Sequence, residues 1–401
     1  MAKGLFDGLK VIDCASFIAA PAAATVLSDF GADVIKIEPP GEGDGYRTLH
    51  SRPGAPQSTK DYGWMLGSRN KRGVALDLKA PEGLKVLYRL VDDADVFVTN
   101  LPLPARRCMK ISYEDLSARN PRLIYASFTA YGEVGAEADK TGFDSTAYWA
   151  RSGLMDQVRP DASSPPSRSV AGMGDQPSGI ALYAAIVTAL YRRQITGKGG
   201  LASSSLLANG LWSNGFLTQA RLVGATIPPR PARAQSASAT SNVYRTRDDR
   251  WFNLAMVNDV KQFPLLAAAL GRPELAQDER FATQPGRRAN GQALLTVLDE
   301  LFGKLDLADL RRTLEAAGIT FGVVHTVDEM LEDKQMRVAE AIVPFEDGSG
   351  ETVSSPFNLD GEIKTRPRQA PNVGQHSEEV LREAGYSSAD IQRLRELKVL
   401  G

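Results

Sequence analysis

One stretch of the sequence places a single carboxylate among glycines at the start of an apolar segment. Residues 172–179 read Gly-Met-Gly-Asp-Gln-Pro-Ser-Gly, and a largely apolar run from Ile180 to Tyr191 follows. The glycines let a large ligand approach the backbone closely, and Pro177 fits the first turn of a helix. The exposed N–H groups and positive dipole end of such a helix favour an ionised carboxylate. Asp175 is therefore a candidate nucleophile, with helix N-capping as the purely structural alternative.

Histidine and cysteine offer few recognisable catalytic patterns in this chain. His50, His325 and His376 lie far apart, and the two cysteines, Cys14 and Cys108, have no metal-ligand spacing. The sequence has neither a Gly-x-Ser-x-Gly elbow nor a His-Glu-x-x-His motif. We expect both cysteines to be small core residues, and we expect no metal site. Carboxylate chemistry is the better hypothesis.

Composition limits the classes of partner. The chain has 401 residues, enough for two domains, and its 47 basic and 48 acidic side chains nearly cancel. No overall field attracts nucleic acid or an anionic membrane. The first residues lack a continuous apolar segment, and the longest apolar run is far shorter than the ~20 residues that span a bilayer. We therefore expect a cytoplasmic protein that binds neither nucleic acid nor membrane.

The N-terminal third alternates between strand and helix signals. Strands are predicted at 9–13, 33–38, 74–78, 96–99 and 123–128, with helices at 20–30 and 81–91. This rhythm predicts an α/β fold with a Rossmann-like, doubly wound parallel sheet, which binds ligands at the carboxyl ends of its strands. The Gly-x-Gly-x-x-Gly fingerprint does not follow the first strand, so a nicotinamide enzyme is not indicated.

Changes in composition divide the chain into domains. A Pro-rich segment followed by small residues begins near residue 225 and is typical of a linker. A hairpin over 242–256 and helices near 259–270, 291–304 and 307–317 follow. We predict a large domain over 1–224, a second, smaller α+β domain over 225–330, and a return to the large domain over 331–401. A final helical segment is predicted near 377–397.

Six segments, in order, carry a family resemblance. They are Gly8-Leu-Lys-Val-Ile-Asp, Gly31-Ala-Asp-Val-Ile-Lys-Ile-Glu-Pro-Pro-Gly, Asn70-Lys-Arg-Gly, Asp93-Ala-Asp-Val-Phe-Val-Thr-Asn, Gly172-Met-Gly-Asp and Val243-Tyr-Arg-Thr. The chain resembles the class III CoA-transferases, the relatives of formyl-CoA transferase and carnitine CoA-transferase. The resemblance implies a large domain built from both chain ends, an interlocked homodimer, and acyl-CoA and a small carboxylic acid as substrates. It implies no cofactor besides coenzyme A, which is itself a substrate.

The resemblance also assigns roles to individual residues. Asp175 corresponds to the family's nucleophile, which forms an acyl anhydride and then a CoA thioester, with backbone N–H groups near Gly174 and Gln176 as oxyanion donors. The implied CoA contacts are Lys71, Arg72, Asn100 and Tyr131. Cys108 stands where the family often has a basic residue, and Arg106 or Arg107 could substitute for it.

Three departures affect the expected substrate. Ile18 stands where formyl-CoA transferase has a positioning glutamine, residues 236–241 replace its poly-Gly loop, and Thr129 replaces a lysine. Formate and oxalate are therefore poor candidates. We expect succinyl-CoA as donor, with a short dicarboxylate or a sulfinate such as 3-sulfinopropionate as acceptor. A free arginine such as Arg47 could hold the second anionic group.

Two other functions stay open. An α-methylacyl-CoA racemase pairs the same aspartate with a histidine, because proton transfer on both faces of an α-carbon needs two groups. The histidine-bearing motif of those racemases reads Gly142-Phe143-Asp144 here, and no histidine lies between His50 and His325. A non-catalytic CoA-binding protein is the third possibility, and the intact candidate nucleophile argues against it.

Overall fold

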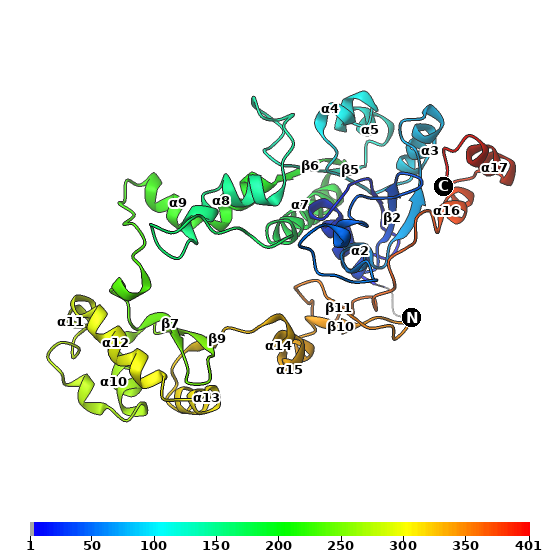
Figure 1. Ribbon diagram of the computed structural model, residues 1–401. Helices are drawn as coiled ribbons and strands as arrows, with labels where there is room; N and C mark the ends of the chain where they lie inside the picture. Colours follow the sequence, from blue (N-terminus) through cyan, green and yellow to red (C-terminus); the bar gives the residue numbers. More distant parts are fainter. Residues whose placement is uncertain (1–3) are drawn as a thin grey trace. The chain divides into compact units, whose positions relative to one another are not determined.

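The computed structural model describes residues 4–401 and divides into two compact units (Figure 1). The large unit extends to Gln157 and also contains Arg168–Ala225 and Gln335–Gly401, and the small unit contains Val158–Ser167 and Thr226–Lys334. The sequence placed the domain boundaries at 225 and 331 but did not anticipate that 158–167 belongs with the small unit. The backbone N–H of Ala162 donates to the carbonyl of Arg230 (2.9 Å), a contact between residues far apart in sequence.

The large unit contains a six-stranded parallel sheet with strand order β3-β2-β1-β4-β5-β6. Its strands are β1 (Lys10–Asp13), β2 (Asp33–Glu38), β3 (Arg72–Ala75), β4 (Val96–Thr99), β5 (Ile124–Thr129) and β6 (Gly200–Ser205). This is the doubly wound order of a Rossmann sheet, so the predicted fold class of the large unit is confirmed. The sequence missed β6, because Gly-Leu-Ala-Ser-Ser-Ser has little strand propensity.

Apolar side chains of the strands alternate between two cores, one on each face of the sheet. Val11 packs with residues of α1 (Ala19–Asp29) and α7 (Asp175–Thr196). Its neighbour Ile12 points to the opposite face, toward α3 (Pro81–Asp92). This alternation fixes which strand residues are buried on each side. Because all six strands are parallel, the polar groups at their carboxyl ends meet at one edge of the sheet.

The remaining elements of the large unit are mostly short. They are η1 (Leu49–Ser51), α2 (Tyr62–Ser68), α4 (Leu103–Cys108), α5 (Tyr113–Arg119), η2 (Asp144–Ala150), α6 (Leu154–Gln157), α8 (Leu206–Ser213), α9 (Gly215–Leu222), β10 (Ile342–Pro344), β11 (Glu351–Val353), α16 (Ser377–Glu383) and α17 (Ser388–Glu396). The single helical segment predicted over 377–397 is two helices, because Gly385 adopts a positive φ of 92° and Ser387 caps a new helix.

The small unit has an α+β composition and its own core. A three-stranded antiparallel sheet, ordered β7-β8-β9, packs with helices in one apolar cluster. Its elements are η3 (Arg233–Gln235), β7 (Ser241–Arg245), β8 (Trp251–Ala255), α10 (Asp259–Ala269), η4 (Pro273–Ala276), α11 (Gln284–Ala289), α12 (Gly291–Phe302), α13 (Leu307–Ala316), β9 (Phe321–Val323) and α14 (Val327–Glu332). Helix α15 (Lys334–Val338) begins at the boundary between the units.

The two cysteines differ in environment. Cys14 follows β1 and is buried, as expected for a small core residue. Cys108 ends α4 and is exposed, so the core prediction was wrong for this residue. On α4 the buried side chain is that of Arg106, and Cys108 lies on the side of the helix that faces solvent.

Candidate functional site

The strand order reverses between β1 and β4, and the loops that leave these strands are joined by one side chain. The amide oxygen of Asn100 accepts from the backbone N–H of Ser16 (2.8 Å), and its nitrogen donates to the Ser16 carbonyl (2.8 Å). Loops at such a switch point form the usual ligand crevice of an open parallel sheet. Asn100 therefore holds the loop after β1 at the carboxyl edge of the sheet.

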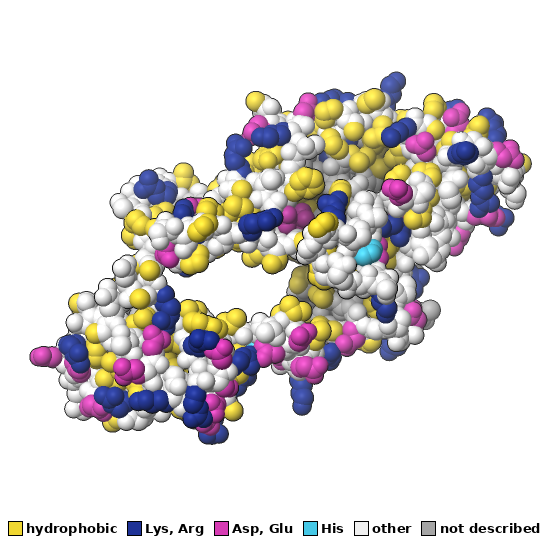
Figure 2. Space-filling model, viewed as in Figure 1, with side chains coloured by type: hydrophobic (Ala, Val, Ile, Leu, Met, Phe, Trp, Pro, Cys, Tyr) yellow, Lys and Arg dark blue, Asp and Glu magenta, His cyan; other side chains and the backbone are white. Residues whose placement is uncertain are grey.

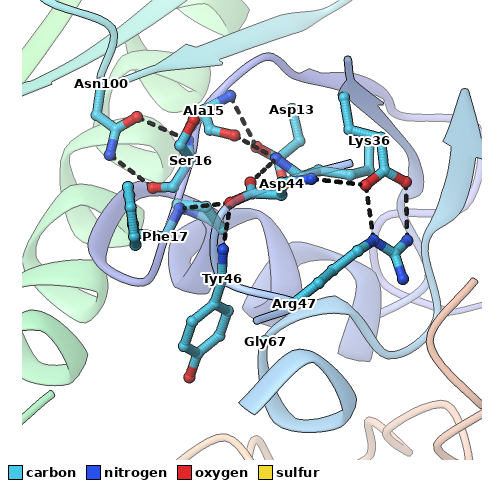
Figure 3. Close-up of polar contacts among 12 residues, drawn as sticks. Asp13, Ala15, Ser16, Phe17, Lys36, Asp44, Tyr46, Arg47, Gly67 and Asn100 are labelled. Atoms are coloured by element: carbon cyan, nitrogen blue, oxygen red, sulfur yellow. Dashed lines mark hydrogen bonds and ion pairs between the residues drawn. The ribbon is translucent and has the colours of Figure 1, made fainter. Parts of the chain in front are cut away.

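Three carboxylates and three cations form a buried charge network beside these loops (Figure 3). Lys36 pairs with Asp44 (2.9 Å), and its ammonium also donates to the carbonyl of Ala15. The other pairs are Lys71 with Asp13 (2.8 Å) and Arg47 with Glu38 (2.8 Å). Burial of such charges is tolerated because each has an opposite partner and further hydrogen bonds.

Asp44 connects this network to the loops that approach Asp175. One oxygen of its carboxylate accepts from the backbone N–H groups of Phe17 (3.2 Å) and Tyr46 (2.9 Å). The pair with Lys36 is a principal reason why the pKa of Asp44 lies below its usual value despite burial, which on its own would raise it. Phe17 has a φ of 61°, a conformation that costs energy for a residue with a side chain. The ionised carboxylate therefore helps to hold Phe17 and Tyr46 in place.

Phe17, Ile18 and Tyr46 make an apolar surface that we call the aromatic wall. Ile18 and Tyr46 belong to one buried cluster, with Phe17 packed against it. The Cδ1 atom of Ile18 lies 3.6 Å from where a Cβ would stand on Gly172, so the wall reaches the loop before α7. The ring of Phe17 packs edge-on against Phe143, with centroids 6.4 Å apart.

Asp175 is the first residue of α7, and Gly174 occupies the N-cap position. No side chain makes a capping hydrogen bond at this helix end, so Asp175 does not act as the N-cap and its carboxylate is not used by the helix. A Cβ on Gly174 would lie 2.6 Å from the ring of Tyr148, and one on Gly179 would lie 2.7 Å from Ala22. Close packing against η2 and α1 therefore fixes the start of α7.

The acidity of Asp175 differs from the sequence-based expectation. Burial, followed by the nearby carboxylate of Asp144, raises the pKa of Asp175 to about 7. The helix N-terminus was expected to favour the ionised form, but desolvation and the like charge outweigh it. Asp144 is the first residue of η2 and accepts a long hydrogen bond from the backbone N–H of Gly174 (3.4 Å). Two carboxylates therefore share the site.

Tyr46 is a further neighbour of Asp175. Burial, followed by the charge of Asp175, raises the pKa of Tyr46 to about 12. Its ring packs on α2, where a Cβ on Gly63 or Gly67 would lie 3.0 or 3.1 Å from it. Tyr46 therefore stays neutral at physiological pH.

The proposed oxyanion donors are partly engaged. The backbone N–H of Gln176 donates to the carbonyl of Gly172 (3.1 Å), so it is used within the first turn of the helix. The N–H of Gly174 has only the long contact to Asp144 and is the more available donor. Ile18 contributes an apolar contact to this side of the site and no polar group from its side chain.

Two of the expected CoA contacts are buried in structural interactions. The side chain of Lys71 is 0% exposed, and its ammonium also donates to the carbonyls of Pro21 (2.9 Å) and Gly67 (2.8 Å). Arg106 is buried and donates to Ser127 and to the carbonyl of Phe128. This geometry does not support a phosphate contact by either side chain, because each would have to break its buried bonds first.

The other expected CoA contacts are more accessible. Arg72 pairs with Asp33, Glu379 and Glu383, and Arg107 pairs with Asp139 (2.8 Å) on the surface. Asn100 lines a small cavity of about 90 Å³ at the ends of β4 and β5, together with Leu101–Leu103, Phe128–Ala130 and Ala138–Gly142. Tyr131 is next to this cavity, with the Lys140 ammonium 5.2 Å from its ring centroid.

Sequence reasoning missed several residues of this site. In the sequence, Asp144 was considered only as part of Gly142-Phe143-Asp144, the motif that lacks a histidine. In the structure it lies near Asp175, and two neighbouring carboxylates are a recognised acid–base arrangement. Lys36 was used only as part of a family segment and Asp44 not at all, because their pairing depends on how the loop after β2 folds back over the strand end. Lys140 had no signal beyond its charge.

The described part of the chain offers neither a metal site nor a membrane-spanning helix. Within residues 4–401, no three His, Cys, Asp or Glu side chains are grouped so that they could hold a metal ion. In the same part of the chain, no helix has the length and apolar character needed to cross a membrane.

Comparison with known proteins gives consistent matches. The profile of CoA-transferase family III matches residues 6–377. A solved structure of a CAIB/BAIF family protein from Brucella suis is 30% identical, with a TM-score of 0.84, over 96% of this chain and 100% of that one.

Three curated relatives differ in the acids that their names specify. The (R)-2-hydroxy-4-methylpentanoate CoA-transferase of Clostridioides difficile is 32% identical over 99% of both chains. The cinnamoyl-CoA:phenyllactate CoA-transferase of Clostridium sporogenes is 30% identical over 98% of this chain and 97% of its own. The human succinyl-CoA:glutarate CoA-transferase is 28% identical over 94% and 85%.

Proposed function

Because the chain belongs to CoA-transferase family III, we propose that it moves coenzyme A from an acyl-CoA to a carboxylic acid through a covalent intermediate on Asp175. The Asp175 carboxylate attacks the thioester carbonyl and expels CoA thiolate, which leaves a mixed anhydride. The thiolate then attacks the aspartyl carbonyl, releases the donor acid and leaves an aspartyl-CoA thioester. A thioester replaces a thioester, so the reaction needs no other energy source.

The second half of the reaction reverses these steps with a different acid. The acceptor carboxylate attacks the aspartyl thioester and expels CoA thiolate, which gives a second anhydride. The thiolate attacks the acyl carbonyl of this anhydride, so the new acyl-CoA leaves and the Asp175 carboxylate is restored. The N–H of Gly174 is the candidate donor to the tetrahedral oxyanions, a role typically worth about 3–4 kcal/mol.

One observation carries this proposal. The Asp175 carboxylate is present at the start of α7 without a capping role, in a desolvated position between the aromatic wall and η2. Desolvation makes a carboxylate more reactive and slows hydrolysis of an acylated intermediate. Raising the pKa toward the working pH also makes the carboxylate more basic while a substantial fraction stays ionised.

Covalent trapping tests this assignment. The protein is incubated with an acyl-CoA and then with hydroxylamine, and the peptides are analysed by mass spectrometry. The peptide that contains Asp175 should carry a hydroxamate. Asp175→Asn should fold and lose transfer by several orders of magnitude, because an amide is a poor nucleophile. Asp144→Asn is the matched control, which should still be labelled at Asp175. A label on another carboxylate, or activity in Asp175→Asn, would contradict the assignment.

For coenzyme A itself, we propose binding at the carboxyl edge of β4 and β5. Asn100 and Lys140 line the cavity there, and the Lys140 ammonium lies 5.2 Å from the ring centroid of Tyr131. Arg107 is the accessible arginine of α4 and, if it releases Asp139, can meet a phosphate. The guanidinium of Arg72 already pairs with carboxylates. The buried Lys71 and Arg106 are assigned a structural role instead of a phosphate contact.

Two substrate classes follow from the sequence and the relatives. Succinyl-CoA with a short dicarboxylate or 3-sulfinopropionate is one, and the name of the human relative specifies succinyl-CoA and glutarate. Acids with an apolar side chain are the other, and two relatives are named for 4-methylpentanoate and phenyllactate derivatives.

We also propose that the chain forms a homodimer, which the family resemblance implies in an interlocked form. Helices α8 and α9 expose Trp212 (87%), Phe216 (89%) and Leu222, and Figure 2 shows hydrophobic side chains on the surface over this segment. Large apolar side chains exposed on neighbouring helices often mark a protein–protein interface. A second copy of the chain is the proposed occupant.

A further inference from the structure

The guanidinium of Arg106 joins the segments at the ends of β4 and β5. Its Nε donates to the carbonyl of Leu101, which follows β4, and one terminal nitrogen donates to the carbonyl of Phe128 (3.0 Å), near the end of β5. The other terminal nitrogen donates to the hydroxyl of Ser127. The side chain of Arg106 is 2% exposed, so water competes little for these bonds. One side chain of α4 therefore fixes the spacing of two neighbouring strand ends.

A carboxylate from the loop after β5 completes this network. An oxygen of Glu133 lies 3.5 Å from the terminal nitrogen of Arg106 that also binds Ser127. The Ser127 hydroxyl accepts from that nitrogen and donates to Glu133, so it connects the two charges. A buried guanidinium is stable only beside an opposite charge and with its N–H groups satisfied. Glu133 and Ser127 therefore hold Arg106 in place, and Arg106 holds the loop that carries Glu133.

The segments that this network joins also line the cavity proposed for coenzyme A. Leu101 and Phe128, whose carbonyls bind Arg106, are both lining residues. Glu133 stands in sequence between the lining stretches 128–130 and 138–142. The cavity has a volume of about 90 Å³, so a small change in the spacing of these segments changes its shape substantially. The network therefore sets the geometry of the cavity.

The neighbouring Arg107 reaches the same loop from the surface. It pairs with Asp139 (2.8 Å), and both side chains are 56% exposed. An exposed pair contributes little to stability, so Arg107 can exchange Asp139 for a phosphate at low cost. Arg106 has no such freedom, because its release would take the guanidinium from Glu133 and from two backbone carbonyls. The two arginines of α4 therefore differ in what they can do.

We propose that Arg106 is a positioning residue for coenzyme A, which holds the loops after β4 and β5 at the spacing that the ligand needs. The inference rests on the proposed function, because it concerns the coenzyme A site that is proposed there at this edge of the sheet. Arg106 acts through Leu101, Phe128 and Glu133 and does not contact the ligand itself. Loss of the network should weaken the binding of acyl-CoA and leave the chemical steps at Asp175 in place.

Two variants of Arg106 test this role in the full-length enzyme. Arg106→Met removes every bond of the guanidinium, and Arg106→Lys keeps the charge on a single nitrogen. Calorimetry gives the Kd of free coenzyme A, and kinetics with butyryl-CoA and the best acceptor from a panel of C3 to C6 acids give KM and kcat. Both Kd and KM should rise at least tenfold in Arg106→Met and less in Arg106→Lys, with kcat within about threefold of wild type. A fall in kcat with Kd and KM unchanged would overturn the proposal.

Glu133→Gln separates positioning from direct contact, because the two roles predict opposite signs. If Arg106 positions the loops, removal of the Glu133 charge loosens the network and raises the Kd of coenzyme A. If Arg106 bound a phosphate itself, removal of a competing carboxylate would lower that Kd. We expect the Kd to rise at least threefold, and a lower Kd would overturn the positioning role.

Arg287→Lys and Arg287→Met are the matched controls. The side chain of Arg287 is 4% exposed and binds the carboxylate of Asp259 (3.2 Å) and the carbonyl of Phe281 (2.7 Å). It resembles Arg106 in burial and bonding but belongs to the small unit. These variants should lose stability and keep the wild-type Kd and KM. An equal rise of Kd in the Arg287 and Arg106 variants would overturn the inference, because general destabilisation would then explain both.

The outcomes also distinguish this inference from the proposed function. An unchanged Kd of coenzyme A in Arg106→Lys and Glu133→Gln, with the hydroxamate still formed on Asp175, would overturn the inference alone. A wild-type enzyme that neither binds coenzyme A nor forms the hydroxamate would overturn the proposed function and the inference with it. If Arg106→Met does not fold, Arg106→Lys and Glu133→Gln still decide the question.

Discussion

Asp175, the candidate nucleophile, lies in an environment that disfavours its ionised form. Asp175 is desolvated and faces Asp144, and both effects raise its pKa. A nucleophile needs the ionised form, and the enzyme should therefore lose activity in mildly acidic solution.

The pH dependence of kcat/KM tests this point. Because the pKa of Asp175 is about 7, kcat/KM should rise with pH and level off above about 7. Below that pH it should fall about tenfold per unit as the nucleophile is protonated. Asp144→Asn removes the like charge, so the midpoint should move to lower pH. A flat profile between pH 5 and 8 in the wild-type enzyme would contradict the raised pKa.

The same pKa predicts a stability effect with a defined sign. The folded pKa near 7 lies above the unfolded value near 3.9, so ionised Asp175 destabilises the folded state. This penalty is absent below about pH 4, grows as the pH rises to about 7, and is constant above that. Asp175→Asn should therefore raise the free energy of unfolding, measured by urea denaturation, more at pH 8 than at pH 5, with a difference of at most about 3 kcal/mol between the two pH values. An equal effect at the two pH values would count against it.

At the residue scale, the sequence identified the candidate nucleophile but not its partners. Asp175 has a local signature, because glycines and Pro177 surround it within eight residues. Asp144 lies more than thirty residues away, and only the fold brings it close to Gly174. Lys71 shows the converse limit, since the family resemblance implies a CoA contact for it, whereas its ammonium is buried on Asp13. Charge is visible in a sequence, but burial is not.

At the scale of elements, the parallel sheet could be predicted and its edges could not. The alternating pattern gave β1, β2, β4 and β5, whose apolar residues are buried on both faces. The predicted third strand was displaced toward residue 78, because Leu76 continues the apolar pattern and pairs as an isolated bridge with Leu400. Leu400 bridges to Leu76 at this edge of the sheet, but nothing in the sequence near residue 76 indicates that partner.

Elements at the carboxyl edge are coupled through the Lys36 and Asp44 pair. Asp44→Ala leaves the buried Lys36 ammonium without its partner and frees the backbone of Phe17 and Tyr46. We expect a loss of about 3–5 kcal/mol in the free energy of unfolding, measured by urea denaturation.

Asp92→Ala is the control for this prediction. It removes a surface pair with Arg119 (2.8 Å) and should cost less than about 1 kcal/mol. Equal costs in the two variants would show that the buried pair contributes little.

At the scale of the whole molecule, the chain builds two compact units and returns to the first after completing the second. The linker near residue 225 was visible in the sequence as a Pro-rich segment followed by small residues. The membership of Val158–Ser167 in the small unit was not, because one short segment without apolar periodicity pairs with residue 230 through its backbone. The family membership deduced from six short segments is confirmed over residues 6–377.

The proposed homodimer is tested by mass and by substitution. Light scattering should give twice the chain mass of 43.3 kDa, and dilution to nanomolar concentration should not change it, because interlocked chains must unfold to separate. Trp212→Glu with Phe216→Glu places charges on the exposed apolar surface of α8 and α9 and should lower the yield of dimer sharply. Val257→Glu, at a 97% exposed position in the small unit, is the matched control and should leave the dimer intact. An active monomer in the wild-type protein would refute the interlocked assembly. A dimer that dissociates on dilution would retain the interface on α8 and α9 but exclude interlocking.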